Sequence, residues 1–477
     1  MMSHGNQLSA TEHLVVLMLE NRSFDHLLGF LYTDQNNVSL SGQPYEGLTG
    51  TESNPDKQGQ PVKVSRILPT DPHPYFTPGV NPGEGYRPTN AQLFGSLTPP
   101  SPPTATMNGF VTNFADTLAL RTQQAQTNPP GHRPTIIPGT TDGDIMRCHT
   151  AESLPVLSAL ARGYAVCDHW FSSAPTETMP NRAFACAATS QGHMDDHTHT
   201  FTCPSIFGLL SREGLDWKVY GYILDPLTRG NFPDIHSAGA SHFGVFTDFQ
   251  AAAAAGTLPV FTFLEPSWAA TGNSEHPVND VAAGERLLQQ VYRTLHDSPA
   301  WDKTLLVITY DEHGGCYDHV PPPATATAPG DGTAGEFGFD FGRFGVRVPA
   351  VLVSPLIDKG IVFRPGGNAT PLDHTSVLKT VEERWSLPAL TQRDAAGTGF
   401  GDVLTLGTPR TDDVLDNVHA PTEAAVNPNA GEISHLQAIH ADLVARQLLA
   451  GPHELYRPLP AAQTPEAYDA FIRDHTE

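Results

Sequence analysis

Two short apolar runs in this chain end in oxygen-bearing side chains. The run from Leu305 to Tyr310 is followed directly by Asp311 and Glu312, and a glycine loop comes next. A short, continuous apolar run is typical of a strand buried in a parallel sheet. Carboxylates at the end of such a strand are costly to desolvate unless a cation neutralises them, and open α/β sheets bind ligands at that end. The pattern therefore favours a divalent cation over a solvated turn.

The second run lies near the N-terminus. His13–Leu19 is apolar and is followed by Glu20 and Asn21, after which the polar segment 22–25 can start a helix. Hard oxygen ligands suit hard or borderline divalent metals. Asn21 by itself is typical of a turn or cap residue, but beside the carboxylates of the first run it becomes a candidate metal ligand.

A third segment, 172–193, supplies candidate hydroxyl groups. Thr176 and Thr178 precede Pro180, and an alanine-rich stretch at 183–189 predicts a helix. A metal-bound hydroxyl at the positive end of a helix dipole is activated as a nucleophile, and backbone N–H groups there can hold a phosphate. On the local sequence alone, an ordinary threonine N-cap is the favoured interpretation. The hydroxyls become candidate nucleophiles only when they are considered together with the acidic residues at the two strand ends.

In their order along the chain, these segments resemble one family, the phosphoesterases that include bacterial phospholipases C, plant non-specific phospholipases C and an acid phosphatase. The matching motifs are VVLMLENRSFDHLLG at 15–29, TMPNR at 178–182, HPVND at 276–280, WDKTLLVITYDEHGGCYDHVPPP at 301–323, VPAVLVSPLI at 348–357 and DHTSVLKTVEERW at 373–385. The resemblance spans most of residues 13–400. It implies an α/β fold similar to alkaline phosphatase, with a doubly wound, mostly parallel central sheet, helices on both faces and long loop insertions.

The resemblance also implies a metal site and a nucleophile. One divalent metal ion, calcium or zinc, is expected on Glu20, Asn21, Asp311 and Glu312. Thr178 is expected to bind the same metal and to attack phosphorus, which would form a phosphothreonine.

Histidines are expected to complete the pocket, because positive charge stabilises the transition state of phosphoryl transfer and an imidazolium can protonate the leaving alcohol. By the resemblance, His73 and His276 are pocket histidines, and His236 or His242 supplies another. His374 lies in the DHTS motif, where a structural role and a catalytic role have equal weight.

Other polar positions are weaker candidates for a role in the reaction. His319 follows the metal motif, and we expect it to fix its loop. The segment HMDDHTH at 193–199 holds three histidines and two aspartates but has no regular ligand geometry, so a metal site there is disfavoured. Glu265 lies in a predicted strand at 258–267, and we expect it to be structural.

Together these residues predict a metal-dependent phosphoesterase. Phospholipase C-type hydrolysis of phosphodiesters is favoured, because in the family threonine at the nucleophile position goes with phospholipases and serine with the acid phosphatase. An acid phosphatase acting on phosphomonoesters is the first alternative. A non-catalytic binding protein on this scaffold is less favoured, because the metal carboxylates and the hydroxyl are all present. The expected partner is a phospholipid or another phosphoester.

The expected organisation is a catalytic domain over residues 1–400 and a C-terminal extension over 401–477 packed on the same domain. Residues 31–140 are dense in Pro, Gly, Asn and Thr and predict an insertion that wraps the sheet and carries His73 to the pocket. Residues 323–345 predict a second flexible excursion at the rim of the site.

Charge and composition exclude several classes of partner. The chain has 27 basic and 51 acidic side chains and a net charge of −24, which opposes binding to nucleic acid and to anionic membranes. No apolar stretch is long enough to predict a transmembrane span. Residues 1–12 lack the features of a signal peptide, so a cytoplasmic location is expected, or a secreted or periplasmic one if a leader has been removed. The five cysteines show no CxxC spacing and are expected to be buried free thiols.

Overall fold

The computed structural model of the protein describes residues 7–367, 369–449 and 458–476, and its centre is an eight-stranded sheet. The strands of this sheet, in spatial order, are β12 (Ile361–Val362), β6 (Ala165–Val166), β11 (Ala350–Val353), β10 (Thr304–Tyr310), β1 (His13–Leu19), β9 (Phe261–Leu264), β7 (Trp217–Gly221) and β8 (Phe243–Val245). Two further sheets pair β2 (Ser53–Pro55) with β3 (Pro61–Lys63), and β4 (Ser65–Ile67) with β5 (Arg147–His149).

The directions of the strands confirm the predicted fold class. β1 is parallel to both of its neighbours, β10 and β9, and the parallel pairing continues through β7 to β8. β11 is antiparallel to both β10 and β6, while β12 is parallel to β6. The sheet is therefore mostly parallel, and the carboxyl ends of β1 and β10 lie at the same edge.

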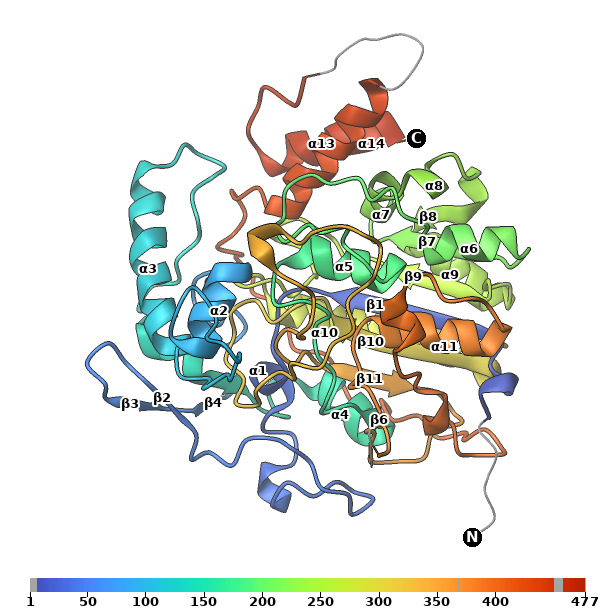
Figure 1. Cartoon of the computed structure of the whole chain (residues 1–477), viewed down its shortest axis with the longest axis horizontal. Coiled ribbons are helices and arrows are strands. Elements are labelled where there is room, and N and C mark those ends of the chain that lie inside the picture. The colour runs from blue at the N-terminus through green and yellow to red at the C-terminus, as the bar shows by residue number, and fades with distance from the viewer. Residues whose placement is uncertain (1–6, 368, 450–457, 477) are drawn as a thin grey trace.

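Helices cover both faces of the sheet. α10 contacts α4 and α9 on one face, and α11 contacts α5 on the other (Figure 1). The helices are α1 (Phe24–Leu28), α2 (Tyr86–Phe94), α3 (Phe110–Thr127), α4 (Pro155–Gly163), α5 (Thr178–Ala187), α6 (Ile206–Arg212), α7 (Leu227–Asn231), α8 (Pro233–His236), α9 (Phe246–Ala255), α10 (Val281–His296), α11 (Thr375–Trp385), α12 (Gln392–Ala395), α13 (His435–Leu449) and α14 (Pro465–Thr476). Short 3-10 helices are η1 (Gln7–Ala10), η2 (Thr33–Gln35), η3 (Asp142–Met146), η4 (Ala240–His242), η5 (Trp301–Lys303), η6 (Glu336–Gly338) and η7 (Gly401–Val403).

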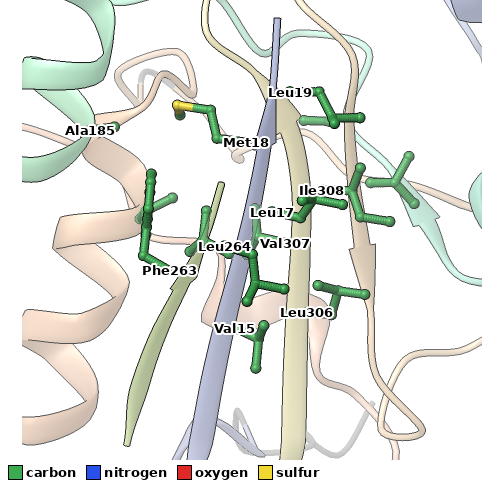
Figure 2. Close-up of a cluster of buried hydrophobic side chains, with 14 of the residues drawn as sticks. Val15, Leu17, Met18, Leu19, Ala185, Phe263, Leu264, Leu306, Val307 and Ile308 are labelled. Atoms are coloured by element: carbon green, nitrogen blue, oxygen red, sulfur yellow. The ribbon is translucent and has the colours of Figure 1, made fainter. Parts of the chain in front are cut away.

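The central strands form the core that holds the strand ends in place. Every residue of β10 is buried, as is every residue of β1 after His13. Figure 2 shows Leu17 of β1, Ile308 of β10 and Phe263 of β9 in one apolar cluster that Ala185 of α5 also joins. Side chains packed on both faces leave these strands little freedom, so the residues that follow them are well positioned for chemistry.

The insertion and the C-terminal segment surround this core. The insertion 31–140 contains β2, β3, β4, α2 and α3. In the C-terminal segment, α13 contacts α7, and Leu436 and Leu443 belong to the same hydrophobic core as the sheet. Among the described helices, none combines the length and the apolar character needed to cross a membrane.

Local predictions agree with the structure in most places. α9 ends at Gly256, whose φ of +66° is the left-handed C-cap expected for a glycine. α5 begins at Thr178, earlier than the alanine-rich stretch that predicted it, so Thr178 itself is helical. The five cysteines are free, and all are buried except Cys203, which is half-buried.

Candidate active site

The two acidic strand ends meet in the structure. β1 and β10 pair with Leu19 opposite Tyr310, so the residues that follow them lie side by side. The backbone N–H of Asn21 donates to Asp311 Oδ1 at 3.0 Å. Asn21 has a φ of +55°, a left-handed conformation that asparagine adopts more readily than most residues. A Cβ added to Gly314 would lie 2.1 Å from the Asn21 carbonyl oxygen, so the loop after β10 needs glycine there.

Thr178 lies against these strand ends. It is the first residue of α5, it is fully buried, and its Oγ1 donates to Asn21 Oδ1 at 3.0 Å. This position is at the positive end of the helix dipole. The hydroxyl of Thr176 instead donates to the Met194 carbonyl oxygen at 2.6 Å. Of the two candidate hydroxyls, that of Thr178 is therefore the one directed at the acidic residues.

Arg182 ties α5 to the strand ends, although sequence analysis gave it no role. It lies one helical turn after Thr178, and its Nε donates to Asp311 Oδ2 at 3.0 Å. Its Nη2 donates to the carbonyl oxygens of Met18 at 3.0 Å and Leu19 at 3.1 Å. Arg182 therefore fixes the hydroxyl and the carboxylates relative to one another. Its place in the TMPNR motif is the signal that could have identified it.

Two carboxylates of this site each keep an oxygen without a partner in the described part of the chain. Glu20 Oε1 and Glu312 Oε1 are buried and have no hydrogen-bond partner among the described residues. Burial raises the pKa of Glu312 well above its usual value, and the nearby charges of Glu84 and Asp311 add to the effect. Burial also raises the pKa of Asp311 to about 6, although Arg182 opposes the shift. The carboxylates and unpartnered oxygens fit a divalent cation, which prefers such ligands.

His276 faces the same site and pairs with Glu84, a residue that sequence analysis missed. His276 Nε2 lies 3.6 Å from Glu84 Oε2, and this oxygen also accepts from Asn21 Nδ2 at 2.6 Å. Burial alone would lower the pKa of His276, but its interaction with Glu84 raises it. The pair therefore favours an imidazolium next to the acidic strand ends.

A second histidine in the site is His435, the first residue of α13, which was also missed. Its Nε2 lies 3.0 Å from Asp196 Oδ2, and its ring centroid lies 5.0 Å from that of His276. Burial alone would lower the pKa of His435, but Asp196 raises it to about 10. Asp196 Oδ1 also accepts from the Met179 backbone N–H at 2.6 Å, which links this pair to the N-terminus of α5. His435 lies beyond the segments that carry the resemblance, so no motif marked it.

A cavity of about 460 Å³ opens beside the two histidines. Its inner end is lined by Glu84, which contacts Asn21, by Asp196, which contacts Met179 of α5, and by their partners His276 and His435. Its outer walls come from α3 and the chain after it, and from the segment 429–439. The cavity therefore gives a ligand access to the site from the side of the insertion and the C-terminal segment.

His374 lies beside the strand ends, in the position of a supporting residue. Its Nε2 is 2.6 Å from the Asp311 carbonyl oxygen, and its Nδ1 accepts from Trp170 Nε1 at 3.4 Å. This arrangement requires a neutral ring with the proton on Nε2. Burial lowers the pKa of His374 to about 4, which is consistent with a neutral ring. Of the two roles expected for His374, the geometry fits the structural one.

Three histidines that were expected in the pocket lie elsewhere, and we correct these placements. His73 is exposed and lines a separate cavity with Gly79, because the insertion reaches the site through Glu84 instead. His242 stacks on Trp217, with Nδ1 at 2.8 Å from the Trp217 carbonyl oxygen. Trp217 begins β7, so His242 lies at the opposite edge of the sheet from the acidic strand ends. His236 is exposed at the end of α8.

The weaker candidates have structural partners. Glu265 accepts from the backbone N–H groups of Leu227 at 2.8 Å and Thr228 at 2.9 Å, which gives it the structural role expected. Within 193–199, His197 and His199 both pair with Asp195, while Asp196 alone turns toward the site. This divergence explains why a dense run of candidate ligands does not form a single cluster.

The segments that build this site also match known proteins. Residues 11–388 match the model of the Phosphoesterase family. The chain is 35% identical to non-specific phospholipase C6 of Arabidopsis thaliana over 466 residues, which cover 94% of this chain and 82% of that protein. It is 27% identical to phospholipase C A of Mycobacterium tuberculosis over 423 residues, which cover 80% of this chain and 74% of that protein. A solved structure with some similarity is the phosphonate monoester hydrolase of Agrobacterium radiobacter, with a TM-score of 0.32 and 14% identity over 54% of this chain and 73% of that one.

Proposed function

We propose that this chain, which belongs to the phosphoesterase family and is a hydrolase of phosphate esters, cleaves phospholipids in the manner of a phospholipase C. Such a reaction breaks the bond between phosphorus and the glycerol oxygen and releases diacylglycerol and a phosphorylated head group. The names of its relatives, non-specific phospholipase C6 and phospholipase C A, support this reaction. The observation that carries the proposal is the buried Thr178 Oγ1, 3.0 Å from Asn21 Oδ1 at the meeting point of two acidic strand ends.

One divalent metal ion is part of the proposal, with calcium and zinc both suited to the donors present. When bound, the metal supplies Lewis acidity and lowers the pKa of an alcohol oxygen that it contacts. The unpartnered oxygens of Glu20 and Glu312 support a cation here. The residues that would hold it are Glu20, Asn21, Asp311, Glu312 and Thr178.

Thr178 is the proposed nucleophile. Its Oγ1 releases its proton to solvent and attacks phosphorus, the bond to the glycerol oxygen breaks, and a phosphothreonine forms; the Thr178 oxygen takes a proton back from solvent when the phosphothreonine is later cleaved. The N-terminal dipole of α5 favours the negative charge that the phosphoryl group brings to this position. Water then cleaves the phosphothreonine, which restores the hydroxyl group and releases the phosphorylated head group.

His276 and His435 are proposed to hold the phosphoryl oxygens and to move protons. Their partners Glu84 and Asp196 raise the pKa of each ring, which favours the imidazolium form of both in the free protein. An imidazolium donates a proton to the departing glycerol oxygen, and the neutral imidazole then accepts a proton from the attacking water. The positive charge of both rings also stabilises the transition state.

The products of a defined substrate panel test this function. Phospholipids in detergent micelles and a phosphomonoester such as p-nitrophenyl phosphate would be incubated with the protein, and the products identified by mass spectrometry. We expect diacylglycerol and phosphorylated head group, with a higher kcat/KM for the lipids than for the monoester. Cleavage of the monoester alone would identify an acid phosphatase and contradict the proposal. Release of phosphatidic acid and a free alcohol would also contradict it, because the bond on the other side of phosphorus would then be the one that breaks.

A further inference from the structure

The two side-chain oxygens of Glu312, one of the expected metal ligands, lie in different surroundings. Oε2 accepts from the backbone N–H of Gly314 at 2.7 Å and lies 3.0 Å from His313 Nδ1. Oε1 is buried and has no hydrogen-bond partner among the described residues. The carboxylate is therefore held through one oxygen, and the other oxygen is the one that remains for a cation.

The contact between His313 and Glu312 is the first of a series that leads away from the strand ends. His313 Nε2 lies 2.8 Å from Gln92 Oε1. Gln92 Nε2 donates to the Gly83 carbonyl oxygen at 2.7 Å and to Asn113 Oδ1 at 2.8 Å. A carbonyl oxygen can only accept, so the Gly83 contact fixes the orientation of the Gln92 amide. Gln92 Oε1 therefore faces His313 as an acceptor, and His313 Nε2 carries a proton.

The insertion encloses the side chains of this series. Gln92 and His313 are each only 1% exposed. The ring of Phe110, at the start of α3, packs edge-on against the His313 ring, with the two centroids 6.4 Å apart. A Cβ added to Gly315 would lie 2.5 Å from the Gly83 carbonyl oxygen and 3.0 Å from Gln92 Nε2, so the loop after β10 lies directly against the start of the α2 segment. Neighbours this close leave the imidazole and the amide little freedom to rotate.

We propose that His313 and Gln92 are positioning residues of the metal site, which hold Glu312 by Oε2 and leave Oε1 free for the cation. This inference rests on the proposed function, because it concerns the metal that the proposed reaction uses. A carboxylate that is already held loses less rotamer freedom when it binds an ion. α2 serves the site at both ends, because Glu84, just before it, accepts from Asn21 Nδ2, and Gln92 lies in its last turn.

The metal affinity of the full chain tests this role without turnover. The metal would be removed by chelation, and the protein titrated calorimetrically with Ca²⁺ and, in a separate series, with Zn²⁺. The binding that Glu312→Gln abolishes defines the site. His313→Leu and Gln92→Met should each weaken that binding by about tenfold or more, as is usual when the partner of a metal ligand is lost.

A conservative variant and a kinetic measurement separate positioning from catalysis. His313→Asn should recover part of the lost affinity, because its amide nitrogen can donate to Glu312 in place of Nδ1. At saturating metal, the loss of kcat in His313→Leu should be smaller than the loss of metal affinity, because Thr178 and its surroundings are unchanged. Metal affinity equal to that of the wild type in both His313→Leu and Gln92→Met would overturn the proposal.

Asn90 provides a matched control on the same helix. Its side chain is fully buried, donates to the Leu97 carbonyl oxygen at 3.2 Å and accepts from Arg343 Nη2 at 2.5 Å. Asn90→Leu therefore removes buried hydrogen bonds as Gln92→Met does, but these do not lead to Glu312. Urea unfolding should show that both variants lose stability, while Asn90→Leu keeps its metal affinity within about twofold. An equal loss of metal affinity in the two variants would overturn the proposal, because the effect would then be a general loosening of the insertion.

Hydrolysis of phospholipids distinguishes a failure of this inference from a failure of the proposed function. If the variants weaken metal binding but the wild type cleaves no phospholipid, the proposed function fails while the positioning role stands. If the wild type cleaves phospholipids and the variants bind metal normally, the proposed function stands and the positioning role fails. If the wild type cleaves phospholipids but binds neither ion in a way that Glu312→Gln abolishes, the lipid specificity stands, and both the metal site and its positioning residues are overturned.

Discussion

The same two segments of the chain build two acidic clusters that are neutralised in different ways. The segment after β1 contributes Glu20 to the strand-end site, and Asp25, in the first turn of α1, to a second cluster with Asp318 and His319. The segment after β10 contributes Asp311 and Glu312 to the strand-end site, beside the end of β1, and Asp318 to the second cluster. All five carboxylates are buried, so each cluster needs positive charge from somewhere.

The second cluster, which we call the arginine cluster, contains its own cation. Arg347 Nη2 donates to Asp25 Oδ1 at 2.9 Å, and Arg347 Nε donates to Asp318 Oδ1 at 3.0 Å. His319 Nδ1 adds a contact of 2.6 Å to the other oxygen of Asp25, which fits the loop-fixing role expected of it.

In the described part of the chain no arginine pairs with Glu20 or Glu312 at the strand-end site; His276 and His435 lie near Glu20, but Glu20 and Glu312 each keep an unpartnered oxygen. A cation built into the chain stabilises a loop permanently, whereas carboxylates left unpaired can receive an exchangeable ion. The difference teaches that a cluster of buried carboxylates does not by itself mark a metal site. What decides is whether a positively charged side chain of the protein already pairs with those carboxylates.

The largest expected effect comes from Thr178, the proposed nucleophile beside the strand-end site. Thr178→Ala should lower kcat by roughly 10⁴-fold or more, because it removes the attacking atom, while folding and metal content stay unchanged. Thr178→Ser should retain some turnover because the hydroxyl remains. Mass spectrometry after quenching turnover of a slow substrate should find phosphate on Thr178. Phosphate on Thr176 would contradict the assignment.

Replacing the pocket histidine His276 should give the next largest loss of activity. His276→Ala should lower kcat by roughly 10²-fold, in line with the contribution of a general acid or of charge stabilisation. His242→Ala is the matched control, because that ring lies at the far edge of the sheet, and its kcat should stay near that of the wild type. Steady-state kinetics of both variants measure the difference. Equal losses, or no loss in His276→Ala, would place catalysis outside the proposed pocket.

Local sequence was enough to predict the strands and the residues at their ends. β1 and β10 are short, uniformly apolar runs, and the acidic residues that follow them meet because adjacent parallel strands end at the same edge. Thr178 also followed from its position before a helix and from the resemblance. These features depend on residues close together in the sequence, where pattern and propensity are informative.

The residues that complete the site could not be predicted in this way. Glu84, Asp196 and His435 lie in loops or at the start of α13, and each reaches the site only through the tertiary packing of an irregular segment. His73 was chosen from the same insertion that supplies Glu84, but the path of a long loop is set by its packing. Periodicity carries no information about where such a loop places its side chains.

Removing the built-in cation should affect stability strongly. Arg347→Met leaves Asp25 and Asp318 buried without their main partner, and breaking such a pair costs about 3–5 kcal/mol. Urea unfolding of the wild type and the variant would measure the change in the free energy of unfolding. Adding Asp25→Asn to Arg347→Met should recover part of the loss, since one unpaired charge is removed. A change below about 1 kcal/mol would show that the arginine cluster is not a structural ion network.

The smallest expected effect is the pH dependence from His319. Burial alone would lower the pKa of His319, but Asp25 raises it to about 8, above the usual value of 6.5. The protonated ring therefore stabilises the fold fully below about pH 6.5, and this contribution of about 2 kcal/mol is lost as the pH rises through 8. The difference in Tm between wild type and His319→Gln should shrink between pH 6 and about 9. A difference independent of pH would contradict the ion pair.

Metal content measured in variants of the two clusters tests the central distinction most directly. Elemental analysis of the purified wild type should give about one equivalent of a divalent metal per chain. The double variant Glu20→Gln, Glu312→Gln should lose this metal while remaining folded, and Asp25→Asn should retain it because its cluster is neutralised by Arg347. Retention of a full equivalent in the double variant, or its loss in folded Asp25→Asn, would contradict the account.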